Sequence, residues 1–383
     1  MSDHLKTLFN EFDRGALSRR QLLQALGIAT VARPAMAFAQ SACTPERAGQ
    51  PGCENTPAKA PFADTGWKTV WLDHISMQVA DYQKEAAYFA ALMNWKIRSD
   101  DGKEALLDIG DLGGIVIRGG YVPPTPAAAP TPAPAPAPAA AGAPAGGRGG
   151  GNRAPRLVTF DSCCWGITPW DTKKVEAELK ARGLDPVADH RGKDFQSFHV
   201  KDPNGFGVQI SNGNRKNRRA QPAAGKLAVP APFASTTWQT MWLDHFSFEV
   251  TDYKASVAFY AALLGWTPGT DTGSQNEVQI ADIGDAIIRR TGGGGGRGAA
   301  AGSAQPAPPV VKQAGFGHIA FGIDPWDADA VKAELDKRGL TGRADTGGST
   351  EIHVAKYQSY HTTSPNGFDL QISNARKATR GIT

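Results

Sequence analysis

A nine-residue segment that recurs along this chain constrains its fold more than any other feature. Residues 71–79 read WLDHISMQV and residues 242–250 read WLDHFSFEV. A weaker copy, FGHIAFGI, covers residues 316–323, and a fourth, DSCCWGI, covers residues 161–167 with Ser162 where the others carry histidine. Each copy alternates and is rich in aromatic and β-branched residues, which predicts a strand. Four related strands indicate a chain built from repeated units.

Each of these strands is followed by the same series of elements. After the first copy, the pattern predicts an amphipathic helix over residues 81–95 and three short strands over 96–98, 105–109 and 114–118. The same order follows the other copies, with helices predicted over 171–182, 252–264 and 327–338. The sequence therefore predicts an α+β protein of four β-α-β-β-β modules in two pairs.

The two pairs define two domains. We expect domain 1 over residues 67–212, a linker over 213–237, domain 2 over 238–375 and a short tail over 376–383. Each domain carries an insert between its two modules, rich in Pro, Ala and Gly over 119–155 and rich in Gly over 291–314. Such tracts bury little surface, so both are predicted to be spacers.

The N-terminus predicts export. A twin-arginine pair at residues 19–20 precedes an apolar run over 22–32 and small residues at positions 37 and 39. This is the pattern of a twin-arginine signal peptide, and the alternative is a short amphipathic helix. We expect a signal over residues 1–39, recognised by the twin-arginine translocation machinery, and a flexible leader over 40–66.

The expected location is periplasmic or secreted. The apolar run is shorter than the roughly 20 residues that a membrane span needs, so we expect no span in the mature protein. A net charge of +4 without a basic stripe gives no reason to expect a nucleic-acid partner. In an oxidising compartment Cys43 and Cys53 are predicted to form a loop disulfide. Cys163 and Cys164 are adjacent on a strand and should point to opposite faces.

Several short motifs recur in the same order in both domains. They include FYAALLGW at residues 259–266, DPNGF at 202–206, SPNGF at 364–368 and the histidines on the strands. Together they resemble the vicinal oxygen chelate superfamily, which contains glyoxalases, bleomycin-resistance proteins and extradiol dioxygenases. In that family two modules pair so that their sheet encloses a cleft, and one divalent metal binds there. The resemblance implies two tandem domains of this fold.

The resemblance also implies a function. We expect a metal-dependent enzyme, similar to a dioxygenase or to a glyoxalase-like lyase or isomerase, that acts on a small oxygenated or aromatic molecule. The alternative is a metal-free protein that binds or sequesters a small molecule, as bleomycin-resistance proteins do. Fold alone does not choose between these classes.

The expected metal site lies in domain 2. His245 and His318 hold the same position in its two modules, and pairing of the modules should bring both imidazoles to one divalent ion (Fe, Mn, Zn or Ni). Gln371 stands where extradiol enzymes carry a glutamate ligand, so it is the third expected ligand. Domain 1 has Ser162 at the second histidine position and is expected to be degenerate and metal-free.

Four further residues are candidates for chemistry in domain 2. His361, Tyr360 and Glu249 are predicted to take part in proton transfer, because extradiol enzymes carry a tyrosine at the His361 position and Glu249 shares the strand face of His245. Arg289 ends a strand and is a candidate for holding an anionic substrate. The alternatives are a solvated carboxylate for Glu249 and a solvated strand end for Arg289.

Overall fold

The computed structural model describes residues 44–45, 53, 56–123, 156–190, 194–219, 225–291 and 314–379. The chain divides into two units, Met1–Cys43 and Thr44–Thr383, and all described residues belong to the second. The expected signal peptide and most of the two inserts lie outside the described residues. Of the expected disulfide pair only Cys53 is described, and it is disulfide-bonded. No helix in the described ranges is long and apolar enough to cross a membrane.

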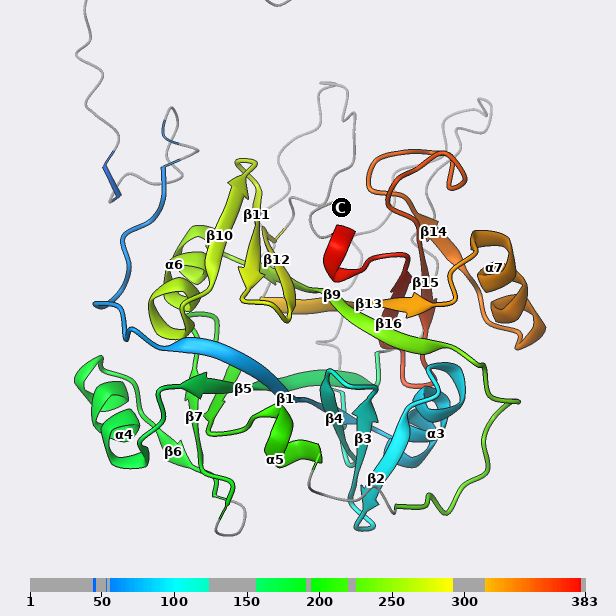
Figure 1. The fold of residues 1–383 in the computed structure, drawn as a ribbon, viewed down its shortest axis with the longest axis horizontal. Helices are drawn as coiled ribbons and strands as arrows, with labels where there is room; N and C mark the ends of the chain where they lie inside the picture. Colours follow the sequence, from blue (N-terminus) through cyan, green and yellow to red (C-terminus); the bar gives the residue numbers. More distant parts are fainter. Residues whose placement is uncertain are drawn as a thin grey trace, which may run out of the picture. The chain divides into compact units, whose positions relative to one another are not determined.

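Domain 1 forms one eight-stranded sheet with the order β2-β3-β4-β1-β5-β8-β7-β6 (Figure 1). The long strands of the two modules, β1 and β5, are antiparallel neighbours at its centre. The strands are β1 (Lys68–Val79), β2 (Lys96–Asp100), β3 (Glu104–Ile109), β4 (Gly113–Arg118), β5 (Val158–Thr168), β6 (Val187–Ala188), β7 (Ser197–Lys201) and β8 (Gly207–Ser211). The modules carry the helices α3 (Tyr82–Leu92) and α4 (Thr172–Ala181).

Domain 2 repeats this arrangement with the order β10-β11-β12-β9-β13-β16-β15-β14. Its strands are β9 (Gln239–Val250), β10 (Thr267–Asp271), β11 (Gln275–Ile280), β12 (Gly284–Arg290), β13 (Gly315–Asp324), β14 (Arg343–Asp345), β15 (Ser359–Thr363) and β16 (Asp369–Ser373). Its helices are α6 (Tyr253–Leu264) and α7 (Ala328–Lys337). The predicted α+β fold of four repeated modules is therefore confirmed.

The helices of all four modules begin in the same way. An aspartate precedes each helix, and its carboxylate accepts a hydrogen bond from the backbone N–H three residues later; these residues are Asp81, Asp171, Asp252 and Asp327. This satisfies a donor that has no partner within the helix. The repeated sequence therefore starts each helix at an equivalent position.

Two segments outside the repeats are more ordered than the sequence suggested. The linker contains a short helix, α5 (Arg215–Arg219), whose first N–H groups donate to the side chain of Asn214. The end of the leader is held rather than loose, because Thr65 donates its N–H to Ala262 and its hydroxyl to Leu263. A leader rich in Pro and Ala has no periodic pattern, so these tertiary contacts left no signal in the sequence.

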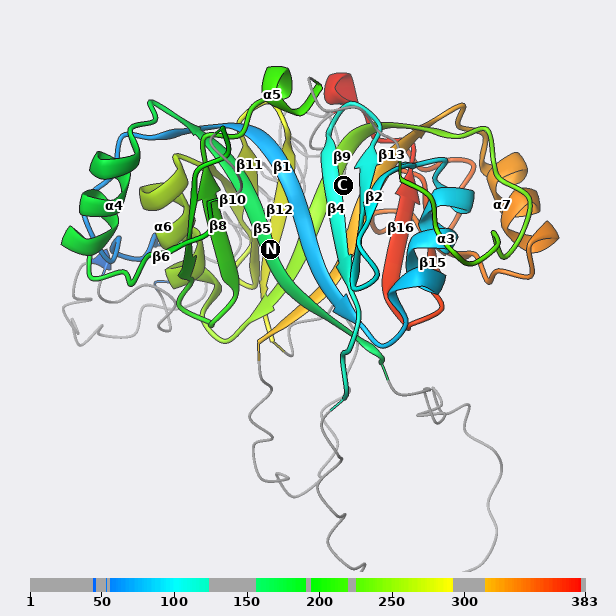
Figure 2. The same cartoon turned by 90° about the horizontal axis from the view of Figure 1, so that it is seen from below.

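The two sheets share one hydrophobic core. Phe160 of β5 stacks on Phe316 of β13 with ring centroids 4.1 Å apart, and Trp165 packs edge-on against Phe246 at 5.8 Å. Residues of both domains belong to one cluster of buried apolar side chains. Figure 2 shows the long central strands of domain 1, β1 and β5, crossing in front of those of domain 2, β9 and β13. Because side chains alternate along a strand, the residues next to these aromatics face away from the shared core.

Reciprocal contacts join the first helix of each domain to a turn of the other. Asn366 donates its backbone N–H and its side-chain amide to Glu85 of α3. Asn204, at the equivalent turn of domain 1, donates to Ser256 of α6. Equivalent positions thus make equivalent contacts in both directions, as a pseudo-twofold arrangement requires.

Candidate metal centre

A row of side chains crosses four neighbouring strands of domain 2. His245 on β9, Ala320 on β13, Gln371 on β16 and His361 on β15 are successive cross-strand partners. Directly paired residues share one face of a sheet. His318 lies two residues before Ala320 and therefore points to the same face. The topology thus brings both expected histidine ligands, Gln371 and His361 together on the face opposite the shared core.

The imidazoles of His245 and His318 point at each other. Their Nε2 atoms are 2.9 Å apart, and the ring planes meet at 76° with centroids 5.1 Å apart. His245 is buried with an exposed fraction of 3%. At this distance the two nitrogens need a proton or a cation between them, because two lone pairs would repel each other.

Asp244 determines which nitrogen of His245 is available. Its carboxylate lies 3.2 Å from His245 Nδ1, so Nδ1–H donates and the Nε2 lone pair faces His318. Tyr357 and Ser373 each donate a hydroxyl to the other oxygen of Asp244 at 2.7 Å. Burial opposes ionisation of Asp244, but His245 and these donors together lower its pKa. A carboxylate behind the imidazole is the arrangement that orients histidine ligands in metalloproteins.

The two polar atoms of the Gln371 side chain differ in their hydrogen bonding. Its Nε2 donates to the Tyr357 hydroxyl at 3.0 Å and to Ser359 Oγ at 2.7 Å. Its Oε1 is buried and has no hydrogen-bond partner among the described residues. Because an unpartnered buried acceptor is costly, a cation bound at this carbonyl would stabilise the site.

His361 lies beside this pair and differs from His318 in its proton affinity. Its Nδ1 is 2.8 Å from Asp369, and its Nε2 is 3.3 Å from Asp345. Burial disfavours a charged His361, but the hydrogen bonds to the two carboxylates outweigh it and raise its pKa. For His318, burial and then the neighbouring His245 and His361 lower the pKa well below its ordinary value. Two imidazoles whose pKa values are shifted in opposite directions therefore lie side by side, with ring centroids 4.8 Å apart.

The donor set fits a divalent metal. Two Nε2 atoms converge, an amide oxygen is available on the same row, and one atom each of His318, His361 and Asp369 lie within 4.8 Å of one another. Asp369, two residues before Gln371 on the same strand face, brings a carboxylate close to the histidines. Imidazole and oxygen ligands together suit Fe, Mn, Zn or Ni.

Arg289 has lost the partners that its counterpart in domain 1 keeps. Arg118 pairs with Glu104 at 2.8 Å and with Asp161 at 2.5 Å. In domain 2 the residue paired with Arg289 across the strands is Gln275, as Glu104 is with Arg118. Gly317, next to His318, replaces Asp161, next to Ser162.

The Arg289 guanidinium therefore remains available. Its Nε is buried with no hydrogen-bond partner in the described ranges, and burial lowers the pKa of Arg289 although Glu249 and Asp345 oppose this. The charge of Arg289 also contributes to the low pKa of His318, so the two side chains lie within electrostatic reach.

The structure separates Tyr360 from this centre and places Glu249 at its edge, paired across the strands with Arg289. Tyr360 pairs with Ile372 and stacks on Trp326 at 6.4 Å, on the sheet face opposite His361. A residue adjacent to His361 on a strand cannot share its face, so the prediction of a proton-transfer role for Tyr360 is not supported by its position. Glu249 is exposed and lies four residues along β9 from His245, roughly 13 Å at the rise of a strand.

The sequence analysis missed several residues of the centre, among them Asp244, Tyr357 and Asp369. The pair Asp-His occurs at 73–74 and again at 244–245, and this repetition was a signal for Asp244. Tyr357 corresponds to Phe195 in domain 1, so the repeat gave no indication of it. Asp369 corresponds to Gly207, and only the register of β13 and β16 places it opposite His318.

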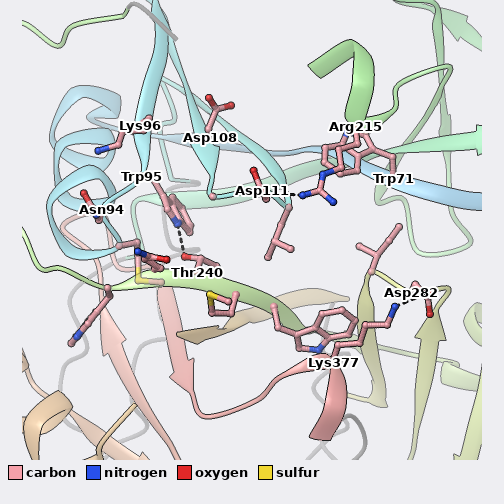
Figure 3. A pocket seen from close by; sticks show the side chains of 18 of the residues that line it. Trp71, Asn94, Trp95, Lys96, Asp108, Asp111, Arg215, Thr240, Asp282 and Lys377 are labelled. Atoms are coloured by element: carbon pink, nitrogen blue, oxygen red, sulfur yellow. Dashed lines mark hydrogen bonds and ion pairs between the residues drawn. The ribbon is translucent and has the colours of Figure 1, made fainter. Parts of the chain in front are cut away.

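A separate groove lies away from the histidines (Figure 3). It has a volume of about 900 Å³ and is lined by both domains, including Trp71, Trp95 and Thr240. Charged residues at its rim form the pairs Asp111–Arg215 and Asp282–Lys377, at 2.7 and 3.0 Å. The groove therefore adds no imidazole or thiolate ligand to the centre described above.

Comparison with known proteins supports this interpretation of the fold. Residues 242–372 match the model of the Glyoxalase/Bleomycin resistance protein/Dioxygenase superfamily. Domain 2 is therefore a member of this superfamily, also called the vicinal oxygen chelate superfamily. A search of curated protein sequences gives no match to the chain.

Solved structures with a similar fold include both glyoxalases and dioxygenases. The Mn(II)-bound glyoxalase from Novosphingobium aromaticivorans is 12% identical, with 80% of this chain and 82% of that chain covered and a TM-score of 0.50. The 2,3-dioxygenase LapB from Pseudomonas sp. KL28 is 12% identical, with 80% and 92% covered and a TM-score of 0.50. A mutant of homoprotocatechuate 2,3-dioxygenase from Brevibacterium fuscum is 14% identical, with 84% and 74% covered and a TM-score of 0.50. At these identities the similarity defines the fold alone.

Proposed function

We propose that domain 2 binds one divalent metal through His245 and His318, with Gln371 as third ligand, and that the chain is a metal-dependent enzyme. The observation that carries this proposal is the 2.9 Å approach of two Nε2 atoms on a sheet face that also carries a buried amide oxygen without a hydrogen-bond partner in the described part of the chain. The lowered pKa of His318 supports it, because only a neutral imidazole offers a lone pair to a metal.

The proposed substrate is a small oxygenated molecule that carries an anionic group. When bound, the metal would polarise a substrate oxygen as a Lewis acid. Arg289 would hold the anionic group, since its guanidinium has no ion pair in the described ranges and lies within electrostatic reach of His318. The structural similarity to glyoxalases and 2,3-dioxygenases is consistent with chemistry on such molecules.

His361 is the proposed proton donor of this site. Its hydrogen bonds to Asp345 and Asp369 raise its pKa, so more of it is charged near neutral pH than of an ordinary histidine. Its ring lies 4.8 Å from that of His318. Each ring nitrogen of His361 faces a carboxylate, so it would deliver a proton to a developing oxyanion by exchanging its longer hydrogen bond, the 3.3 Å contact of Nε2 with Asp345, for one to the substrate.

Metal analysis of the purified chain tests the proposal. We expect one ion in domain 2 for the wild type, and His245→Ala and His318→Ala should each remove it. Gln371→Glu should tighten binding by tenfold or more, because it adds an anionic ligand. His353, which is exposed, offers a matched control: His353→Ala should leave the metal content unchanged. Retention of the ion in both His245→Ala and His318→Ala would exclude this site, and a wild-type chain without an ion in domain 2 would leave the metal-free binding function.

A further inference from the structure

Domain 1 carries a row of side chains that corresponds to the metal centre but has a different composition. His74 on β1, Cys164 on β5, Gln209 on β8 and His199 on β7 are successive cross-strand partners. This is the register of His245, Ala320, Gln371 and His361 in domain 2. Domain 1 therefore lacks the second strand histidine but has a thiol where domain 2 has the methyl group of Ala320.

Three buried polar atoms on this face have no hydrogen-bond partner in the described ranges: His74 Nε2, Ser162 Oγ and Gln209 Oε1. The three residues have exposed fractions of 4%, 2% and 0%. Buried polar groups in folded proteins are nearly always satisfied, so three such atoms on one face indicate a missing ligand. Arg118 on the same sheet is neutralised by Glu104 and Asp161, so its charge does not oppose a cation.

The orientation of His74 identifies the kind of ligand. Its Nδ1 lies 2.8 Å from Asp73 Oδ1, so Nδ1 carries the proton and the Nε2 lone pair is left without a donor. Gln209 Nε2 donates to Ser197 at 2.8 Å, so the atom that remains is its carbonyl oxygen. His74 Nε2 and Gln209 Oε1 are therefore both acceptors. A cation can bind to two acceptors, whereas an anion cannot.

The thiol of Cys164 lies on the same sheet face. One potential ligand atom each of Asp73, His74 and Cys164 lie within 4.8 Å of one another, and Cys164 Sγ is also 3.4 Å from Ser211 Oγ. Imidazole and thiolate donors at bond lengths of about 2.1 and 2.3 Å are the ligands that Zn²⁺ selects, whereas Mg²⁺ and Mn²⁺ prefer oxygen. Cys163 points to the opposite face and belongs to the hydrophobic core, so it cannot take part.

We propose that domain 1 binds a second metal ion, a thiophilic divalent cation such as Zn²⁺, through His74 Nε2 and the Cys164 thiolate, with the Gln209 carbonyl as an oxygen ligand. This replaces the expectation that domain 1 is metal-free. The site shares no residue with the centre in domain 2, so the two proposals stand or fall separately.

Titration of the metal-free full-length chain with Co²⁺ and Zn²⁺ tests the second site. We expect two ions per chain, and Co²⁺ should give a thiolate-to-metal charge-transfer band in the near ultraviolet. Cys164→Ala should remove the band and one ion, and it introduces the residue that domain 2 has at this position, which favours normal folding. The band should persist in His245→Ala and in the adjacent-thiol control Cys163→Ala.

The reactivity of the Cys164 thiol is a second readout, which does not depend on the folding of Cys164→Ala. Zn²⁺ should slow the reaction of the wild-type Cys164 thiol with a thiol reagent by tenfold or more, and His74→Gln should remove this protection. An unchanged metal count in Cys164→Ala, or equal thiol reactivity with and without Zn²⁺, would overturn the second site. Loss of an ion with Cys164→Ala but none with His245→Ala would instead overturn the proposed function and keep this inference.

Discussion

At the scale of single residues, the two domains differ most in which charges are compensated. Arg118 has two carboxylate partners, whereas the positions equivalent to those partners in domain 2 are Gln275 and Gly317. A guanidinium that is largely desolvated and lacks an ion pair in the described ranges is a costly feature unless something binds it. This is the basis of the proposal that Arg289 binds an anionic group of the substrate.

A pair of catechols tests this role of Arg289. The metal-loaded chain should bind a catechol that carries a carboxylate more tightly than uncharged catechol. Arg289→Gln should weaken binding of the acid by tenfold or more, about 1.4 kcal/mol, and leave catechol binding nearly unchanged. The matched variant Arg118→Gln should affect neither ligand. Equal loss of both catechols in Arg289→Gln would point to a structural role, and calorimetric titration distinguishes these results.

At the scale of elements, the contact between α3 and the 364–368 turn depends on a buried carboxyl group. Glu85 accepts two hydrogen bonds from Asn366 and is fully buried. Burial raises the pKa of Glu85, and the hydrogen bonds from Ser364 and Asn366 only partly offset this. The contact between α3 and the 364–368 turn therefore favours the protonated form of Glu85.

The sign of the resulting pH dependence follows from proton linkage. The unfolded chain loses the Glu85 proton near pH 4.3, whereas the folded chain keeps it to a higher pH. Stability of the wild type should therefore fall, relative to Glu85→Gln, as the pH rises from about 4 through the folded pKa. Urea unfolding at several pH values measures this difference. Glu351→Gln, at an exposed position, is the control, and a pH-independent difference between wild type and Glu85→Gln would contradict the prediction.

At the scale of the whole described unit, the domains are not independent. Phe160, Phe246, Phe248 and Phe316 from the two sheets pack into one cluster, and the reciprocal contacts of Asn204 and Asn366 bind each domain to the first helix of the other. The histidine centres lie on the outer faces of the sheets. The interface therefore holds the two domains together, and each candidate metal centre draws its ligands from one domain.

A fragment of domain 2 alone should reveal this dependence. Residues 225–383 would expose the aromatic face that domain 1 covers, and an exposed apolar face of this kind promotes association. Because the two domains present equivalent faces, we expect the fragment to form a dimer through the same surface. Light scattering after size-exclusion chromatography measures its mass. A monomeric fragment as stable as the full-length chain would contradict the shared core.

The sequence by itself determined the repeated modules, the strands and helices within them, and the positions of the two strand histidines of domain 2. These features depend on local alternation, helix-start residues and repetition, which are visible along the chain. Only the tertiary structure separated Tyr360 from His361, brought Asp369 and Tyr357 to the centre, and distinguished Arg118, which has two carboxylate partners, from Arg289, which has none in the described ranges. Hydrogen bonds and ion pairs act over a few ångströms between strands distant in sequence, so the register of the sheets decided which donors and charges lack partners.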